Sequence, residues 1–200
     1  MSLIDPHWPP VVRYQKERPG ELLHLDTKKL GRFREVGHRI TRQRTFGKGG
    51  GWEVLHVAID DASRVTYAEI LADEKAPTVE AFLVRAVEWF RSRGITVEAV
   101  MTDNGPAYLS KRFAARCRAL SIKHLRTKPY TPRTNGKVER MIQTLLREWA
   151  YALAYPTSDE RQRWLVPYLH FYNVHRRHSA LNYNPPISRL DRNNVLTFDS

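Results

Sequence analysis

Asp26 lies near the end of a short apolar run in the stretch LLHLDT, residues 22–27, which has the pattern of a buried strand. The stretch VMTDNG, residues 100–105, likewise places Asp103 directly after a predicted strand. A third stretch, NGKVER, residues 135–140, places Glu139 in the first turn of a long amphipathic helix. Carboxylates held on rigid elements can bind divalent ions. The three stretches therefore predict an α/β fold with a metal-dependent site.

The order of the predicted elements is that of an α/β protein, because three opening strands are followed by alternating helices and strands. We expect strands at residues 21–30, 52–60, 64–71, 95–102 and 122–125, and helices at 77–93, 110–120, 138–154 and 158–174. The glycine-rich residues 47–51 predict a mobile tip. In terms of domains, we expect a linker or arm at 1–20, a core at 21–175 and a basic C-terminal tail segment at 176–200.

The charge balance points to a polyanionic partner. Lysine and arginine total 33 residues against 21 aspartates and glutamates, a net charge of +12. Cationic side chains bind nucleic acids because the neutralised phosphates release counterions; a basic protein without such a partner is the alternative. Cys117 is the only cysteine, which excludes an intrachain disulfide and a thiolate zinc cluster and fits a reducing cytoplasm. The sequence shows no signal peptide and no run near the ~20 apolar residues that span a membrane.

Ordinary structural explanations compete with the metal-site reading. A glutamate in a first helical turn favours the helix dipole, and Asp-Asn-Gly sequences are common in turns. Glu139, however, lies at the margin of an apolar stripe, where it can face a cleft while the helix stays packed. That stripe comprises Val138, Met141, Ile142, Leu145, Trp149 and Ala152. Asp60 and Asp61 follow another apolar strand, and we assign them to a hairpin turn at 60–63.

The spacing and the local motifs resemble a known family. Between Asp103 and Glu139 lie 35 residues, and the pattern resembles the Asp-Asp-35-Glu signature of retroviral integrases and bacterial integrase-core insertion-sequence transposases. The segment YNVHRRHSALN, residues 172–182, resembles a C-terminal signature of the bacterial members, with Arg177 where proline is usual. The resemblance extends from about residue 18 to about residue 190. It implies a ribonuclease H-like fold, in which a five-stranded mixed sheet is flanked by helices.

The resemblance also implies an activity. A DDE-type polynucleotidyl transferase performs metal-dependent phosphodiester hydrolysis and strand transfer in DNA transposition. Asp26, Asp103 and Glu139 are then the catalytic residues and the ligands of two Mg²⁺ or Mn²⁺ ions, with Asp26 bridging both. Water as the nucleophile gives nicking, and a 3′-hydroxyl gives strand transfer. The implied partner is DNA, with a homo-oligomer assembled on it, and the implied location is the bacterial cytoplasm, at the nucleoid.

Basic and polar residues around the carboxylates are candidate DNA contacts. Four of them lie in the loop at 126–137, for which a solvated loop is the alternative. The candidates are Lys28, Lys29, Arg126, Lys128, Arg133, Lys137, Arg140, Gln143, Arg147 and Arg176.

Two other functions and two other sites compete with this interpretation. The rival functions are a ribonuclease H-like nuclease that only hydrolyses and a non-catalytic DNA-binding derivative. A histidine metal site at His170, His175 and His178 lacks a carboxylate or thiol partner, so we do not favour it. Trp89, Trp149 and Trp164 are expected in the core rather than as base-stacking platforms. Because family members usually carry helix-turn-helix domains before this region, we expect a fragment or a shortened relative.

Overall fold

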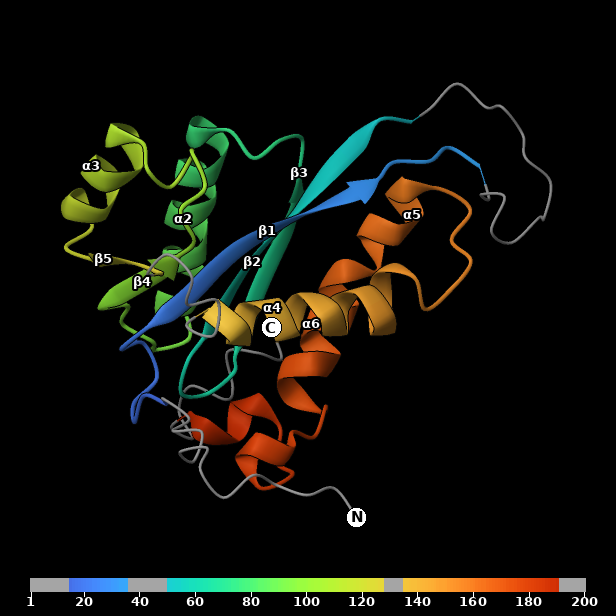
Figure 1. Ribbon diagram of the computed structural model, residues 1–200. Helices are drawn as coiled ribbons and strands as arrows, with labels where there is room; N and C mark the ends of the chain where they lie inside the picture. The colour runs from blue at the N-terminus through green and yellow to red at the C-terminus, as the bar shows by residue number, and fades with distance from the viewer. Residues whose placement is uncertain (1–14, 36–49, 128–134, 191–200) are drawn as a thin grey trace, which may run out of the picture.

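The structure, a computed structural model, describes residues 15–35, 50–127 and 135–190. Its strands are β1 (Leu23–Gly31), β2 (Trp52–Asp60), β3 (Thr66–Leu71), β4 (Ala99–Thr102) and β5 (Lys123–Arg126). They form one sheet in the order β3-β2-β1-β4-β5 (Figure 1). β1, β2 and β3 pair antiparallel, whereas β4 joins β1 and β5 joins β4 in parallel. The predicted five-stranded mixed sheet is confirmed, with β1 at its centre.

Helices cover both faces of this sheet. They are α2 (Ala76–Arg91), α3 (Lys111–Ala119), α4 (Gly136–Leu145), α5 (Ser158–Arg163) and α6 (Leu165–Val174). α2 and α3 bury Phe82 and Phe113 in one apolar cluster with Leu25 of β1. α4 and α6 bury Met141 and Leu169 in a second cluster on the opposite face. In Figure 1, α4 runs across the strands on the side that faces the viewer. None of the helices in the described ranges is both long and apolar enough to cross a membrane.

Alternation along β1 assigns its side chains to the two faces. Leu23 and Leu25 lie in the cluster with α2, while Leu30 lies in the cluster with α4. Because successive strand residues point to opposite faces, His24 and Asp26 share the α4 face with Leu30. The site candidate Asp26 therefore faces the helix that carries Glu139.

The helix α4, which carries Glu139 in its first turn, ends earlier than predicted. α4 passes into a π turn over Leu146–Ala150, in which the Tyr151 N–H donates to the Leu146 carbonyl at 3.1 Å. Trp149 is buried, as the apolar stripe predicts, but Ala152 lies beyond the helix and is exposed. The prediction that Ala152 completes the stripe is wrong, because the wide turn ends the regular periodicity.

The second predicted C-terminal helix is divided. α5 ends before Trp164 and α6 begins after it. The Trp164 side chain is 53% exposed, so the prediction that it belongs to the core is wrong. Trp149 is 1% exposed and Trp89 packs against the α2 cluster, as expected.

Candidate active site

Asp26 is a half-buried carboxylate near the middle of β1. Its Oδ1 accepts a hydrogen bond from the Thr27 N–H at 2.7 Å. Burial raises the pKa of Asp26 to about 6, against the lowering effect of that N–H, and the negative charges of Asp103 and Glu139 raise it further. Burial disfavours the charged form of an acid, and like charges nearby do the same. The Asp26 side chain therefore lies within the electrostatic reach of both other candidates.

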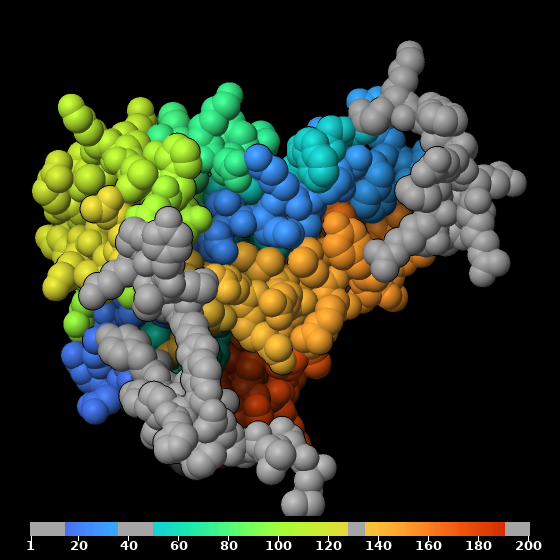
Figure 2. All heavy atoms as spheres, in the orientation of Figure 1, coloured from blue at the N-terminus to red at the C-terminus, as the bar shows by residue number. Residues whose placement is uncertain are grey.

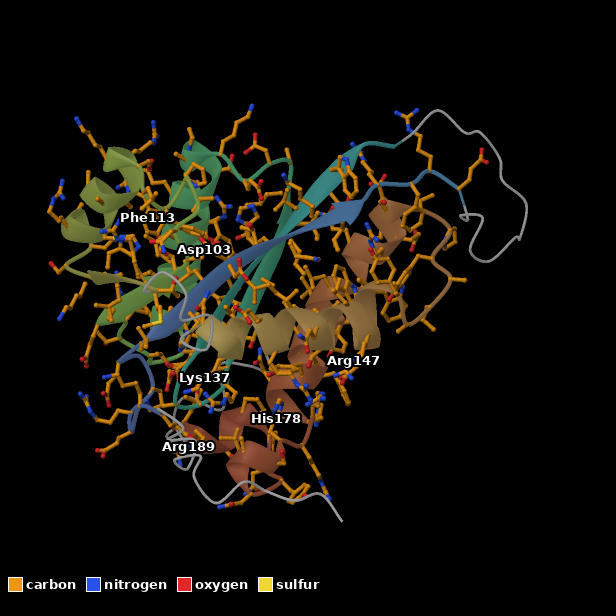
Figure 3. All side chains as sticks on the ribbon, in the orientation of Figure 1. Asp103, Phe113, Lys137, Arg147, His178 and Arg189 are labelled. Carbon is orange, nitrogen blue, oxygen red and sulfur yellow. The ribbon has the colours of Figure 1, made fainter. Side chains whose placement is uncertain are left out.

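Asp103 directly follows β4, next to β1 in the sheet. The parallel register pairs Leu23 with Val100 and His24 with Met101, and its continuation brings Asp103 to the level of Asp26. Asp103 is held by its own turn, because its Oδ1 accepts the Gly105 N–H at 2.9 Å. The Thr102 hydroxyl donates to the Asp103 carbonyl at 2.9 Å. Figure 3 shows Asp103 just beyond the end of β4.

Glu139 lies in the first turn of α4, as predicted, and its side chain is exposed. Val138, Met141 and Ile142 around it are buried against the sheet. The apolar neighbours fix the helix, while Glu139 stays at the open margin. The surface of α4 lies beside that of β1 on the face shown in Figure 2.

The chemistry of the three carboxylates fits a hard divalent cation. Among the described residues, no three Asp, Glu, His or Cys side chains form a ready-made metal cluster. Asp26 nevertheless experiences the charges of Asp103 and Glu139, and a cation between such carboxylates would relieve their repulsion. Oxygen donors of this kind are those that Mg²⁺ and Mn²⁺ prefer.

Tyr108 adds a protonated hydroxyl to this region. Burial raises its pKa well above the ordinary value, and the charges of Asp26, Asp103 and Glu74 raise it further. Its ring packs edge-on against Phe113, with the ring centroids 5.3 Å apart. The buried phenol lies within the electrostatic reach of Asp26 and Asp103, a feature that sequence reasoning missed.

Of the competing candidates, Asp60 is the last residue of β2 and Asp61 begins the turn to β3, so the hairpin turn predicted at 60–63 begins one residue later. The Asp60 carboxylate accepts hydrogen bonds from the Gly20 N–H at 2.8 Å and from the Ser63 N–H and hydroxyl at 2.7 Å each. Asp61 accepts from the Lys16 N–H at 2.6 Å and pairs with Lys137 Nζ at 2.5 Å. Both carboxylates are fully buried and satisfied within the fold.

Five of the proposed DNA contacts are exposed around the carboxylates: Lys28, Arg126, Arg140, Gln143 and Arg147. The Lys28 charge is near enough to lower the pKa of Asp26. In Figure 3, Arg147 points away from the sheet. These side chains can approach a phosphate backbone without breaking a bond within the described part of the fold.

The other five proposed contacts differ. Lys29 forms an exposed ion pair with Glu74 at 2.7 Å. Lys137 pairs with buried Asp61, and Arg176 pairs with Glu148 at 2.6 Å, so both of these cations are engaged within the fold. Lys128 and Arg133 lie outside the described residues, as do residues 47–49 of the predicted mobile tip.

Sequence reasoning also missed a polar cluster beneath the start of α4. His24 is 2% exposed and its two ring nitrogens lie 3.0 Å from Asn135 Oδ1 and 2.7 Å from Asp61 Oδ1. The signal was available in part, because His24 stands two residues before Asp26 and shares its strand face. Contacts between residues 111 positions apart could not be read from local patterns.

Comparison with known proteins gives two overlapping family matches. Models described as Integrase core domain match residues 16–132 and 120–186. The Intracisternal A-particle Pol-related polyprotein of mouse intracisternal A-particle MIA14 is 38% identical over 107 residues, covering 53% of this chain and 11% of the polyprotein. The Gag-Pro-Pol polyprotein of simian retrovirus SRV-1 is 30% identical over 142 residues, covering 68% of this chain and 8% of the polyprotein. The chain thus spans about a tenth of the length of these curated relatives.

Solved structures of similar fold are also integrases. A chain of the simian T-cell lymphotropic virus intasome, in complex with PP2A regulatory subunit B56 gamma, has a TM-score of 0.65 and 21% identity, covering 86% of this chain and 55% of that one. The HTLV-2 integrase catalytic core domain in complex with magnesium, in its trimeric form, has a TM-score of 0.59 and 18% identity, covering 87% and 98%. This likeness confirms the predicted ribonuclease H-like fold. With a family model matching more than half of its length, the chain belongs to the integrase core domain family.

Proposed function

We propose that this chain is the catalytic domain of a DNA transposase or integrase, a DDE-type polynucleotidyl transferase. The observation that carries the proposal is the placement of three carboxylates: Asp26 on β1 and Asp103 after β4 lie at the same level of neighbouring parallel strands, and Glu139 lies in the first turn of α4, which packs on β1. The match to the Integrase core domain model supports it.

Asp26, Asp103 and Glu139 would hold divalent metal, which we propose to be two Mg²⁺ or Mn²⁺ ions. Bound divalent ions supply charge for an in-line displacement at phosphorus and generate the attacking oxygen. A solved HTLV-2 integrase core is described in complex with magnesium, which supports the choice of metal.

The chain's own residues would orient the DNA. Lys28 on β1 and Arg140 next to Glu139 offer exposed cations near the carboxylates. Gln143 and Arg147, about one and two helical turns after Glu139, offer an exposed amide and a further exposed cation. Contacts of this kind fix the position of a phosphate backbone without reading its sequence. Correct placement of the scissile phosphate then limits the reaction to one bond.

DNA and further copies of the chain are the proposed partners. The net charge of +12 supports DNA. The related HTLV-2 core is described in dimeric and trimeric forms, which supports self-association. The bacterial cytoplasm, at the nucleoid, remains the proposed location.

The test is a joining assay with labelled 3′-recessed duplexes and a supercoiled target plasmid, run with Mg²⁺, Mn²⁺ or EDTA. We expect metal-dependent nicking and strand transfer, both abolished in Asp103→Asn and Glu139→Gln. Glu88→Gln, the same change at an exposed position of α2, is the matched control and should keep full activity.

The remaining outcomes separate the rival functions. Nicking without joined product would identify a hydrolytic nuclease. DNA binding without nicking would identify a non-catalytic derivative. Full activity in well-folded Glu139→Gln would exclude the three-carboxylate site.

A further inference from the structure

A buried polar cluster ties the start of α4 to the sheet, and Asp61 is its centre. The Asp61 carboxylate is fully buried and is contacted from three separate segments. His24 of β1 lies 2.7 Å away, Lys137 of α4 lies 2.5 Å away, and the Lys16 N–H lies 2.6 Å away. Lys137 also donates to the Asp61 carbonyl at 3.3 Å. Two elements of the candidate active site, β1 and α4, therefore meet at a single carboxylate.

His24 makes the second connection to α4. Asn135, directly before the helix, is 3% exposed, and its amide nitrogen donates to the Leu25 carbonyl at 3.3 Å. That bond fixes the amide orientation and turns Asn135 Oδ1 toward His24 Nδ1, at 3.0 Å. Both ring nitrogens thus lie within hydrogen-bond distance of an oxygen, one from Asn135 and one from Asp61.

These bonds lie beside the carboxylates of the candidate site. His24 and Asp26 share one face of β1 because they are two residues apart. Asn135 and Glu139 are four residues apart at the start of α4, about one helical turn. Between the strand and the helix, His24 and Asn135 face each other and are joined by a hydrogen bond. Asp26 and Glu139, the next residues along the same strand face and helix, carry like charges that oppose their approach. The attractive pair therefore restrains the repulsive one.

We infer that His24 and Asp61 are positioning residues that hold the first turn of α4 against β1 and so set Glu139 relative to Asp26. The inference rests on the proposed function, because it concerns how the three carboxylates are presented to metal. Lys137 and Asn135 are the α4-side partners of this device. Outer groups that orient metal ligands characteristically change metal affinity when removed.

Asp60, the last residue of β2 and the direct neighbour of Asp61, provides a matched control. It is as buried as its neighbour Asp61, but its hydrogen bonds go to Gly20 and Ser63 rather than to β1 or α4. Asp60→Asn and Asp61→Asn make the same chemical change one residue apart. A structural role alone would lower stability in both, whereas a positioning role would weaken metal binding only in Asp61→Asn.

The experiment measures Mn²⁺ affinity of the whole chain without DNA, from the electron paramagnetic resonance signal of the free ion. We expect Asp61→Asn and His24→Leu to bind Mn²⁺ about 10-fold more weakly than wild type, and Asp60→Asn to bind as wild type does. His24→Gln keeps one donor and should show an intermediate loss. At saturating Mn²⁺, strand transfer by His24→Gln should recover much of its kcat, with KM for DNA unchanged.

The outcomes distinguish this inference from the proposed function. If Asp26→Asn and Asp103→Asn bind Mn²⁺ as wild type does, the proposed metal site itself is wrong. If those variants lose Mn²⁺ while folded Asp61→Asn and His24→Gln stay within twofold of wild type, only the positioning role is overturned. Circular dichroism verifies folding. Should Asp61→Asn not fold, the comparison of His24→Gln with Asp60→Asn decides the question by the same twofold criterion.

Discussion

Arg176 binds Glu148 through two nitrogens on one edge of its guanidinium: Nε lies 2.7 Å from Oε2 and Nη2 lies 2.6 Å from Oε1. The Tyr168 hydroxyl donates to the same carboxylate at 2.9 Å. Glu148 lies in the π turn after α4, and Arg176 follows α6. The pair therefore joins two helical segments, and the Arg176 guanidinium is engaged within the fold rather than available to DNA.

Replacing Arg176 should accordingly affect stability more than DNA binding. Both side chains are partly exposed, so we expect Arg176→Ala to lower the free energy of unfolding by about 1 kcal/mol. Arg176→Lys should recover only part of this, since an ammonium cannot form the two-pronged contact. Urea denaturation measures the first effect. The salt dependence of DNA affinity should match wild type, and a reduced slope would restore Arg176 as a phosphate contact.

Lys28 and Lys137 should respond differently to removal. Lys28 is exposed on β1. Lys28→Ala should therefore make the slope of log K against log salt less steep by about 0.9, the value for one phosphate contact. Lys137 is paired with buried Asp61, so Lys137→Ala should leave the slope nearly unchanged and lower the stability by about 1–3 kcal/mol. Fluorescence anisotropy across a salt series, with urea denaturation of both variants, measures the difference. Equal slopes for the two variants would contradict the assignment.

Stability without metal should depend on the ionisation of Asp26. Its pKa is raised in the folded protein from 3.8 to about 6. The folded state therefore holds a proton more tightly than the unfolded state. The resulting contribution to the free energy of unfolding is full below pH 4 and is lost as pH rises through 6. In EDTA, the free energy of unfolding of Asp26→Asn relative to that of wild type should rise by on the order of 2 kcal/mol between pH 4 and pH 7. Urea denaturation at the two pH values measures the gain. Asp159→Asn, at an exposed position of α5, is the control.

Asn173 should be needed to protect the sheet edge. Its side chain accepts from the Thr66 N–H at 2.8 Å and donates to the Thr66 carbonyl at 2.9 Å, so it occupies the place of a neighbouring strand on β3. Asn173 is 1% exposed. We expect Asn173→Asp to lower the free energy of unfolding by about 2 kcal/mol, because the donor to the carbonyl is lost and a charge is buried. Thermal and urea unfolding measure the change. An unchanged midpoint would mean that water replaces the amide.

Local patterns predicted the main elements well. The strand expected at 52–60 matches β2, and the helix expected at 77–93 differs from α2 by one or two residues at each end. These elements have clear periodicity and clear limits, such as Gly94 after the helix. The positions of Asp26, Asp103 and Glu139 on strand, strand end and first helical turn were also predicted, because each follows from its immediate neighbours.

Contacts between distant segments could not be predicted. Nothing near Lys137 in the sequence indicates that its ammonium pairs with Asp61, 76 residues earlier. The same holds for Arg176 and Glu148, which meet only when α6 packs beside α4. A basic residue near a carboxylate looks the same in sequence whether it binds DNA or a buried acid. The prediction that Trp164 lies in the core was wrong for a related reason, because helical spacing cannot show that the helix divides at that residue.

The hydrogen bonds from Lys16 and Gly20 to the β2–β3 turn matter for anyone who shortens this chain. A version that started at the first strand would remove one backbone N–H donor from each of the buried carboxylates of Asp61 and Asp60, a loss of about 1–3 kcal/mol for a buried acceptor left unsatisfied. Gly20 itself has φ +90, and a Cβ there would collide with the Thr96 carbonyl. The residues just before β1 should therefore be kept, glycine included, when the ends of an expressible catalytic unit are chosen.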